Sequence, residues 1–147
     1  MSETKRPMIA VALEIMMNAH RTQLDKGGHP YVFHPLTVAS KQTSEDAVIV
    51  GLLHDVVEDS SYTLDDLRSL GFSEEIIEAV GLLTHPEGME YLDYVKRLSS
   101  SKLARCVKVA DLHMNSDLSR LKEVTEKDLA RVEKYKKALA ILGETEE

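Results

Sequence analysis

The stretch that most constrains this chain is residues 47–59, which read Ala-Val-Ile-Val-Gly-Leu-Leu-His-Asp-Val-Val-Glu-Asp. Residues 47–57 are apolar nearly all round apart from the pair His54 and Asp55, a pattern typical of a helix buried in the middle of a fold. Burying an imidazole and carboxylates there costs roughly several kcal/mol per ion unless something compensates. A metal ion would compensate best. The stretch therefore predicts a buried central helix and raises the question of whether the chain supplies further metal ligands.

The rest of the chain also follows a helical pattern. Apolar residues recur at helical spacing over residues 7–23, 74–83, 91–98, 102–117 and 125–142. Thr43 or Ser44, Thr63 with Asp66, Ser73 and Thr125 stand where helix N-caps are expected. In the last helix, four residues are expected to face inward: Leu129, Val132, Leu139 and Leu142. Since no segment indicates a strand, the pattern predicts an all-α fold.

Composition sets further limits. The chain has 147 residues, enough for one domain with a core, so residues 1–147 are expected to form a single domain. A net charge of -7 argues against binding to nucleic acid or to an anionic membrane surface. The N-terminal residues lack the apolar core of a signal peptide and no stretch approaches a membrane span, so we expect a cytoplasmic protein. The lone Cys106 excludes an internal disulfide and is expected to be buried.

Two more residues qualify as partners of the central pair. His34 follows a Gly/Pro-rich loop at a helix start, and Asp111 lies in a second apolar helix. Two His and two Asp give mixed nitrogen and oxygen ligation, which suits Mn²⁺, Fe²⁺ or Zn²⁺ better than Ca²⁺. On a continuous helix, His54 and Asp55 would point about 100° apart. Both reach one ion only if it lies over the groove between them.

Two carboxylates, Glu58 and Asp59, follow Asp55 by one helical turn. The spacing places all three on one helix face, where they repel one another unless a cation lies nearby. One interpretation is a solvated helix end before the serines at 60–61. The other is that Glu58 and Asp59 hold and deprotonate a water beside a metal. Spacing alone does not separate the two.

Three blocks of sequence carry a resemblance to a known family: residues 28–35 (Gly-His-Pro-Tyr-Val-Phe-His-Pro), 53–59 (Leu-His-Asp-Val-Val-Glu-Asp) and 108–111 (Lys-Val-Ala-Asp). In this order they resemble the HD superfamily of metal-dependent phosphohydrolases. The closest branch is the (p)ppGpp hydrolase domain of the RelA/SpoT-type alarmone enzymes and their small stand-alone relatives. The similarity runs from about residue 19 to 121. It implies an HD-type fold of about seven or eight helices.

The resemblance also implies roles for particular residues. The protein ligands of one divalent ion would be His34, His54, Asp55 and Asp111. That ion is most often Mn²⁺ in this branch, with Fe²⁺, Zn²⁺ and Ni²⁺ as alternatives. Glu58 and Asp59 match the acidic pair that orients or activates the attacking water. The residues that match substrate contacts are Lys26, Asn115, Arg131 and Tyr135. For Arg131 and Tyr135, an ordinary surface arginine and a partly buried tyrosine are the competing interpretation.

The implied activity is (p)ppGpp 3′-pyrophosphohydrolase, with a small nucleotide as substrate and the oligomeric state left open. Asp25 departs from the pattern, because alarmone hydrolases usually have there an arginine that contacts the nucleobase. An anion in place of this cation loses stacking and repels phosphate. Two alternatives therefore stay open: a phosphohydrolase acting on another nucleotide, and a non-catalytic nucleotide-sensing HD module.

Overall fold

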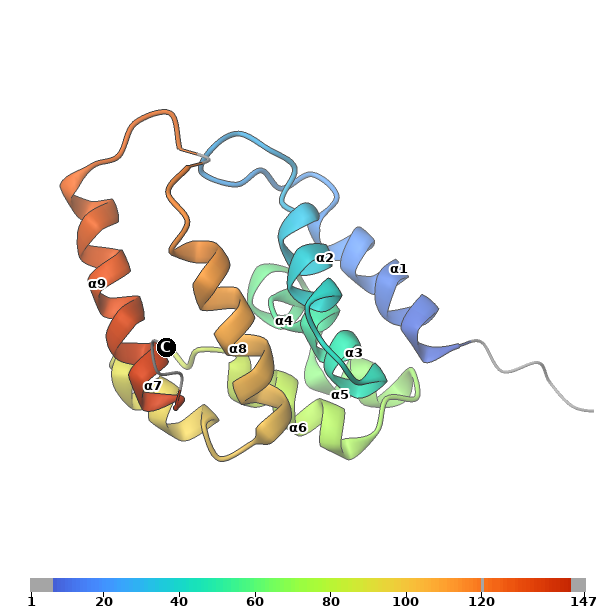
Figure 1. The fold of residues 1–147 in the computed structure, drawn as a ribbon. Coiled ribbons are helices and arrows are strands. Elements are labelled where there is room, and N and C mark those ends of the chain that lie inside the picture. Colours follow the sequence, from blue (N-terminus) through green and yellow to red (C-terminus); the bar gives the residue numbers. More distant parts are fainter. Residues whose placement is uncertain (1–6, 120, 144–147) are drawn as a thin grey trace, which may run out of the picture.

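The computed structural model describes residues 7–119 and 121–143, and these form helices joined by loops, of which those after α1 and α8 are long (Figure 1). The helices are α1 Met8–His20, α2 Phe33–Ser40, α3 Glu45–Leu53, α4 Val56–Asp59, α5 Leu64–Ser69, α6 Glu74–Leu83, α7 Tyr91–Leu98, α8 Lys102–Asn115 and α9 Glu126–Ile141. Among the described residues, the only β pairing is an isolated bridge between Leu24 and Pro30. The expected all-α class is confirmed.

Side-chain caps begin several helices where the sequence indicated. Ser44 and Ser73 accept the backbone N–H three residues on. Thr63 and Thr125 form capping boxes, in which the carboxylates of Asp66 and Asp128 accept the backbone N–H groups of Thr63 and Thr125. Each cap satisfies donors that would otherwise be unpaired and is worth about 1 kcal/mol. Local sequence thus sets where these helices begin.

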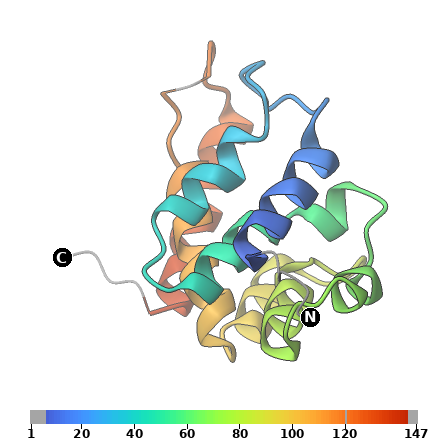
Figure 2. The same ribbon diagram turned by 90° about the vertical axis from the view of Figure 1, so that its right-hand side faces the viewer.

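Helix α3 lies at the centre of the fold. It contacts α1, α2, α6 and α8, and most of its side chains are buried. Figure 2 shows α1 and α2 side by side, with the orange α8 behind α2. A Cβ at Gly51 would lie 3.0 Å from Ala39 Cα, so glycine lets α3 approach α2 closely. Within the described residues, no helix is long and apolar enough to cross a membrane.

The expected central helix is not continuous. Helix α3 ends at Leu53 and α4 begins at Val56. At the junction, Asp55 has φ -108° and ψ 0°, in the bridge region rather than the helical one. This break divides the predicted element into two helices, so the described residues hold nine helical segments.

Two expectations about exposure are wrong. Leu129 is 54% exposed, because the core side of α9 is formed by other residues such as Ala138. Cys106 is also exposed. It lines a surface cavity of about 400 Å³ together with Lys41 and Arg105.

Candidate metal centre and adjoining pocket

The four predicted ligands meet in one place. One ligand atom from each of His34, His54, Asp55 and Asp111 lies within 4.8 Å of the other three. His34 comes from α2, His54 and Asp55 from the junction after α3, and Asp111 from α8. His34, His54 and Asp111 are buried, and Asp55 is partly buried. The contacts among α2, α3 and α8 therefore assemble a set of donors that could hold one metal ion.

The break between α3 and α4 lets neighbouring residues share this point. Its non-helical backbone at Asp55 turns the carboxylate back toward the preceding imidazole. His54 Nε2 consequently lies 3.2 Å from Asp55 Oδ2 and 3.4 Å from Asp111 Oδ1. On a continuous helix, an ion could reach both side chains only from the groove between them. The non-helical backbone at Asp55 removes this requirement.

His54 presents an unpaired nitrogen to the cluster. Its Nδ1 lies 2.6 Å from the carbonyl oxygen of Gly51, so Nδ1–H donates there. Its Nε2 is buried and makes no hydrogen bond within the described part of the chain, although two carboxylates lie close to it. An imidazole nitrogen aimed between carboxylate oxygens is the arrangement a metal ligand needs, with the other nitrogen fixed by a carbonyl. The donor set therefore fits a divalent cation.

The cluster attracts positive charge. Burial lowers the pKa of His54, but Asp55 and Asp111 outweigh it and hold that pKa well above its ordinary value. Burial raises the pKa of Asp111, but Lys108 and the two histidines hold it well below its ordinary value. Carboxylates that stay ionised inside the fold favour any cation that reaches them. A metal ion would replace the proton on His54.

Two neighbours hold the carboxylates in place. Lys108 Nζ lies 2.9 Å from Asp111 Oδ2, and His34 Nε2 lies 2.7 Å from Asp111 Oδ1. Tyr31 donates its hydroxyl hydrogen to Asp55 Oδ2. Sequence reasoning gave no role to Tyr31 and quoted Lys108 only as part of a motif. The Lys-x-x-Asp spacing on a helix was the available signal for Lys108.

Glu58 and Asp59 lie beside the cluster, and each is held by a different segment. Glu58 Oε1 accepts the backbone N–H of His85 at 2.5 Å, from the loop after α6. Asp59 Oδ2 accepts the Gln23 amide at 3.2 Å, from the loop after α1. Burial, with Asp55 adding to it, raises the pKa of both carboxyls. Neither belongs to the four-ligand group, which leaves both available for proton transfer.

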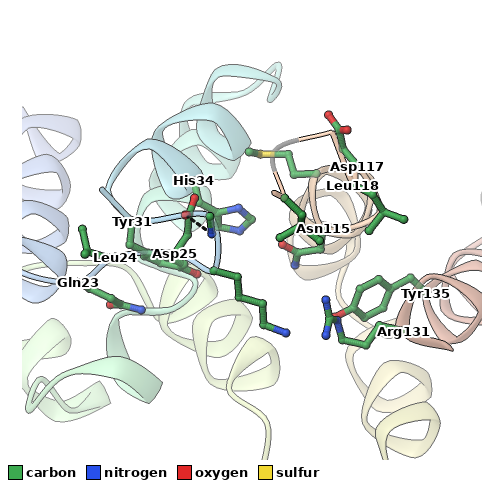
Figure 3. A pocket seen from close by; sticks show the side chains of 14 residues that line it. Gln23, Leu24, Asp25, Tyr31, His34, Asn115, Asp117, Leu118, Arg131 and Tyr135 are labelled. Atoms are coloured by element: carbon green, nitrogen blue, oxygen red, sulfur yellow. Dashed lines mark hydrogen bonds between the residues drawn. The ribbon is translucent and has the colours of Figure 1, made fainter. Parts of the chain in front are cut away.

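A pocket of about 320 Å³ opens next to the cluster. His34, Tyr31 and Gln23 line its metal end. All four predicted substrate residues line it too: Lys26, Asn115, Arg131 and Tyr135. Figure 3 shows Arg131 and Tyr135 of α9 facing the space across from His34 and Tyr31. Arg131 also pairs with Asp128 one turn earlier, and Asn115 donates to Asp111 Oδ1 at 3.1 Å.

Asp25 lines the same pocket but has a local task. Its Oδ1 accepts the backbone N–H groups of Gly27 and His29, each at 2.9 Å. This closes the loop between α1 and α2 that carries Lys26 to the pocket. The carboxylate is therefore a turn-forming group as well as a negative charge at the pocket.

Several known proteins are similar in sequence to part of this chain. A GTP pyrophosphokinase of Streptomyces antibioticus is 39% identical over 92 residues, which are 60% of this chain and 10% of that protein. A guanosine-3′,5′-bis(diphosphate) 3′-pyrophosphohydrolase of Borreliella burgdorferi is 37% identical over 86 residues, 56% of this chain and 13% of that protein. The chain thus spans only 10% to 13% of the length of these curated relatives. No protein-family model matches it.

A solved structure covers far more of the chain. It is a metazoan ortholog of SpoT that hydrolyses ppGpp and plays a role in starvation responses. It is 26% identical, with a TM-score of 0.76, and the match covers 96% of this chain and 88% of that one. The resemblance to the hydrolase domain of RelA/SpoT-type enzymes, with its all-α HD-type fold, is therefore confirmed in sequence and in structure.

Proposed function

We propose that this chain is a metal-dependent hydrolase that removes the 3′ pyrophosphate of (p)ppGpp to leave GDP or GTP. The supporting observation is the four-donor cluster of His34, His54, Asp55 and Asp111 at the end of a pocket lined by Lys26 and Arg131. Cations at a pocket suit a substrate that carries many phosphate charges. The solved relative that hydrolyses ppGpp supports the same substrate.

We assign the ion as Mn²⁺, with Fe²⁺, Zn²⁺ and Ni²⁺ as alternatives for the same nitrogen and oxygen donors. A bound divalent ion would supply Lewis acidity for the phosphoryl group and would lower the pKa of a water. Glu58 and Asp59 take the proton from the attacking water, and their raised pKa values bring them closer to neutral pH, where a general base works best. Arg131 and Lys26 hold the phosphates in line for attack.

The reaction balances without any further reactant. The water oxygen bonds to the phosphorus attached to the 3′ oxygen, and the bond between that phosphorus and the 3′ oxygen breaks. The proton taken from water by the carboxylates returns to the 3′ oxygen, which becomes a hydroxyl. Pyrophosphate and GDP or GTP are the products. Asp59 and Glu58 thus act first as base and then, once protonated, as acid.

Asp25 favours a second candidate, hydrolysis of another nucleotide by the same groups. The residue puts a carboxylate at the pocket where a base-contacting cation is usual. Under this alternative the metal cluster and the acidic pair keep their roles, and only the recognition of the base changes. A nucleotide-sensing module without turnover is the third outcome.

One screen separates these. The purified chain, incubated with Mn²⁺, is mixed separately with ppGpp, pppGpp and common 5′-nucleotides, and products are separated by anion-exchange chromatography. We expect ppGpp to give GDP and pyrophosphate in equal amounts, with EDTA stopping the reaction. Turnover of other nucleotides with none of ppGpp would support the second candidate. Tight nucleotide binding without any product would support the sensing module and overturn hydrolysis.

A further inference from the structure

Two hydrogen bonds connect His20, a buried residue at the end of α1, to Asp59 through Gln23. His20, at the end of α1, is fully buried, and its Nδ1 lies 2.8 Å from Gln23 Oε1. The amide nitrogen of Gln23 then donates to Asp59 Oδ2 at 3.2 Å. His20 Nε2 is buried and has no hydrogen-bond partner among the described residues. His20 does not line the pocket, but its Nδ1 lies 3.9 Å from Asp59 Oδ2 and its ring centroid lies 5.0 Å from that of Tyr31. The hydrogen-bonded route from His20 to Asp59 is the one through Gln23.

The direction of this chain follows from which groups can donate. An ionised Asp59 only accepts, so Gln23 must turn its NH₂ group toward it. The amide oxygen of Gln23 then faces His20 and needs a donor, which places a proton on His20 Nδ1. The other tautomer would set the lone pair of Nδ1 against the amide oxygen and would bury an unpaired N–H at Nε2, which is costly. Only one arrangement satisfies every close pair.

We propose that His20 and Gln23 are positioning residues for Asp59, and that His20 acts by fixing the orientation of the Gln23 amide. The Gln23 amide holds Asp59 Oδ2 by one hydrogen bond, which leaves Asp59 Oδ1 to accept the proton of water. This inference rests on the proposed hydrolysis, in which Asp59 is part of the base. It adds two residues to which no role in the reaction has been given above.

The charges around Asp59 explain why such support is useful. Burial and the neighbouring Asp55 raise the pKa of Asp59, whereas Gln23, His20 and His54 lower it. Asp55 therefore pushes Asp59 away from itself and toward its protonated form. The Gln23 amide opposes both effects by giving the ionised carboxylate a hydrogen-bond donor at Oδ2.

The tautomer of His20 can be observed without any activity. Histidine side chains of the full chain, labelled with ¹⁵N, are examined by long-range ¹H–¹⁵N correlation with Zn²⁺ present, since paramagnetic Mn²⁺ would broaden the signals. We expect a proton on His20 Nδ1, assigned by loss of the signal in His20→Asn. In Gln23→Met, which removes the acceptor but keeps the length, the proton should move to Nε2. A proton on Nε2 in the wild type would overturn the proposal.

Kinetics of two His20 variants separate hydrogen bonding from packing. His20→Asn keeps a donor near the position of Nδ1 but leaves the larger cavity, whereas His20→Leu fills more of the space and has no donor. If positioning matters, His20→Leu lowers kcat about 10- to 100-fold with little change in KM, and His20→Asn recovers most of this loss. If His20 only packs, His20→Asn is the worse of the two, which contradicts the proposal.

Two further measurements complete the test. The double variant His20→Leu/Gln23→Met should be no slower than Gln23→Met within about twofold, because both changes break one chain of contacts. Thr22→Ala, an exposed neighbour outside the pocket, serves as the control and should match the wild type. An inactive wild type with the expected His20 tautomer would reject the hydrolysis but not the hydrogen-bond chain. An active wild type with full kcat in Gln23→Met would reject the positioning role alone.

Discussion

The two ends of the pocket are built in different ways. At the metal end, the ligands come from helices that pack on one another, and three of the four are buried. At the far end, Lys26 and Asn115 are exposed, while Arg131 and Tyr135 are half-buried on α9. Packing therefore fixes the position of each donor at the metal end. At the far end, packing puts fewer limits on which side chains can be present. Packing thus constrains the groups proposed for the chemistry more strongly than the groups proposed for choosing the substrate.

The largest effect should come from breaking the metal end. Asp111→Asn removes a proposed ligand and leaves the partly buried Lys108 without its ion-pair partner. We expect bound divalent metal, measured by mass spectrometry, to fall below about a tenth per chain, and activity to fall at least about 1000-fold. In EDTA the variant should lose roughly 3–5 kcal/mol of stability.

Two controls interpret that result. Asp93→Asn changes an exposed carboxylate on α7 and should leave metal and stability unchanged. Lys108→Met added to Asp111→Asn removes both charges, so stability should return while metal binding does not. If the double variant regained metal, Asp111 would not be a ligand.

The acidic pair beside the metal cluster, which does not line the pocket, should show an intermediate effect. Glu58→Gln keeps an acceptor for the His85 N–H but cannot take a proton. Activity should fall about 100-fold, the range for loss of a general base, with metal content unchanged. Loss of metal along with activity would instead place Glu58 among the ligands.

The same variant gives a test of stability against pH. Burial raises the pKa of Glu58 in the folded chain, so the folded state binds this proton more tightly than the unfolded chain does. Glu58 therefore stabilises the fold least at a pH above its pKa in the folded chain. It stabilises the fold most below about pH 4, which is close to the pKa of a glutamate in the unfolded chain. In urea unfolding with EDTA, Glu58→Gln should be more stable than wild type at pH 7, by less than about 1 kcal/mol after solvent screening. The gap should close at pH 4, and a gap that widened there would contradict the sign.

A smaller effect is expected at the far end. Arg131→Ala should raise KM about tenfold, equivalent to about 1.4 kcal/mol, while kcat and bound metal change little. Lys137→Ala, which removes an exposed cation of the same helix outside the pocket, is the matched control. A fall in kcat with KM unchanged would show that Arg131 acts in the transition state instead of holding the substrate.

The smallest effect should come from Asp25→Asn. The amide oxygen can still accept the N–H groups of Gly27 and His29, so the loop keeps its shape while one negative charge is removed. Repulsion between unit charges across a water-filled pocket is of the order of 0.5 kcal/mol. KM for ppGpp should therefore fall about twofold, measured at low salt. A rise in KM would mean that the carboxylate contacts the substrate directly.

Much of this could be predicted from sequence because it depends on local or paired signals. The caps at Ser44, Thr63, Ser73 and Thr125 are read from residue types next to helical patterns, and all four form. The four ligands were expected because polar groups in buried helices need one another. The structure brings them together, and it also brings the predicted substrate residues to one pocket.

Other features depend on contacts that a linear pattern does not record. The apolar period runs straight through His54 and Asp55, so it gives no sign that a single residue leaves the helical region there. Leu129 fits the apolar spacing of α9 but is 54% exposed. Gln23 and Asp59 are 36 residues apart, and only the folding of α1 against α4 brings them together.

The close contact between Gly51 and Ala39 also affects the spacing of the proposed metal ligands. His34 lies on α2 and His54 directly follows α3, so the gap between these helices sets the gap between the two imidazoles. A methyl group at Gly51 would press on the Ala39 backbone at 3.0 Å and force the helices apart. The spacing of two proposed metal ligands is thereby tied to one hydrogen atom at Gly51, a residue that is not itself one of them.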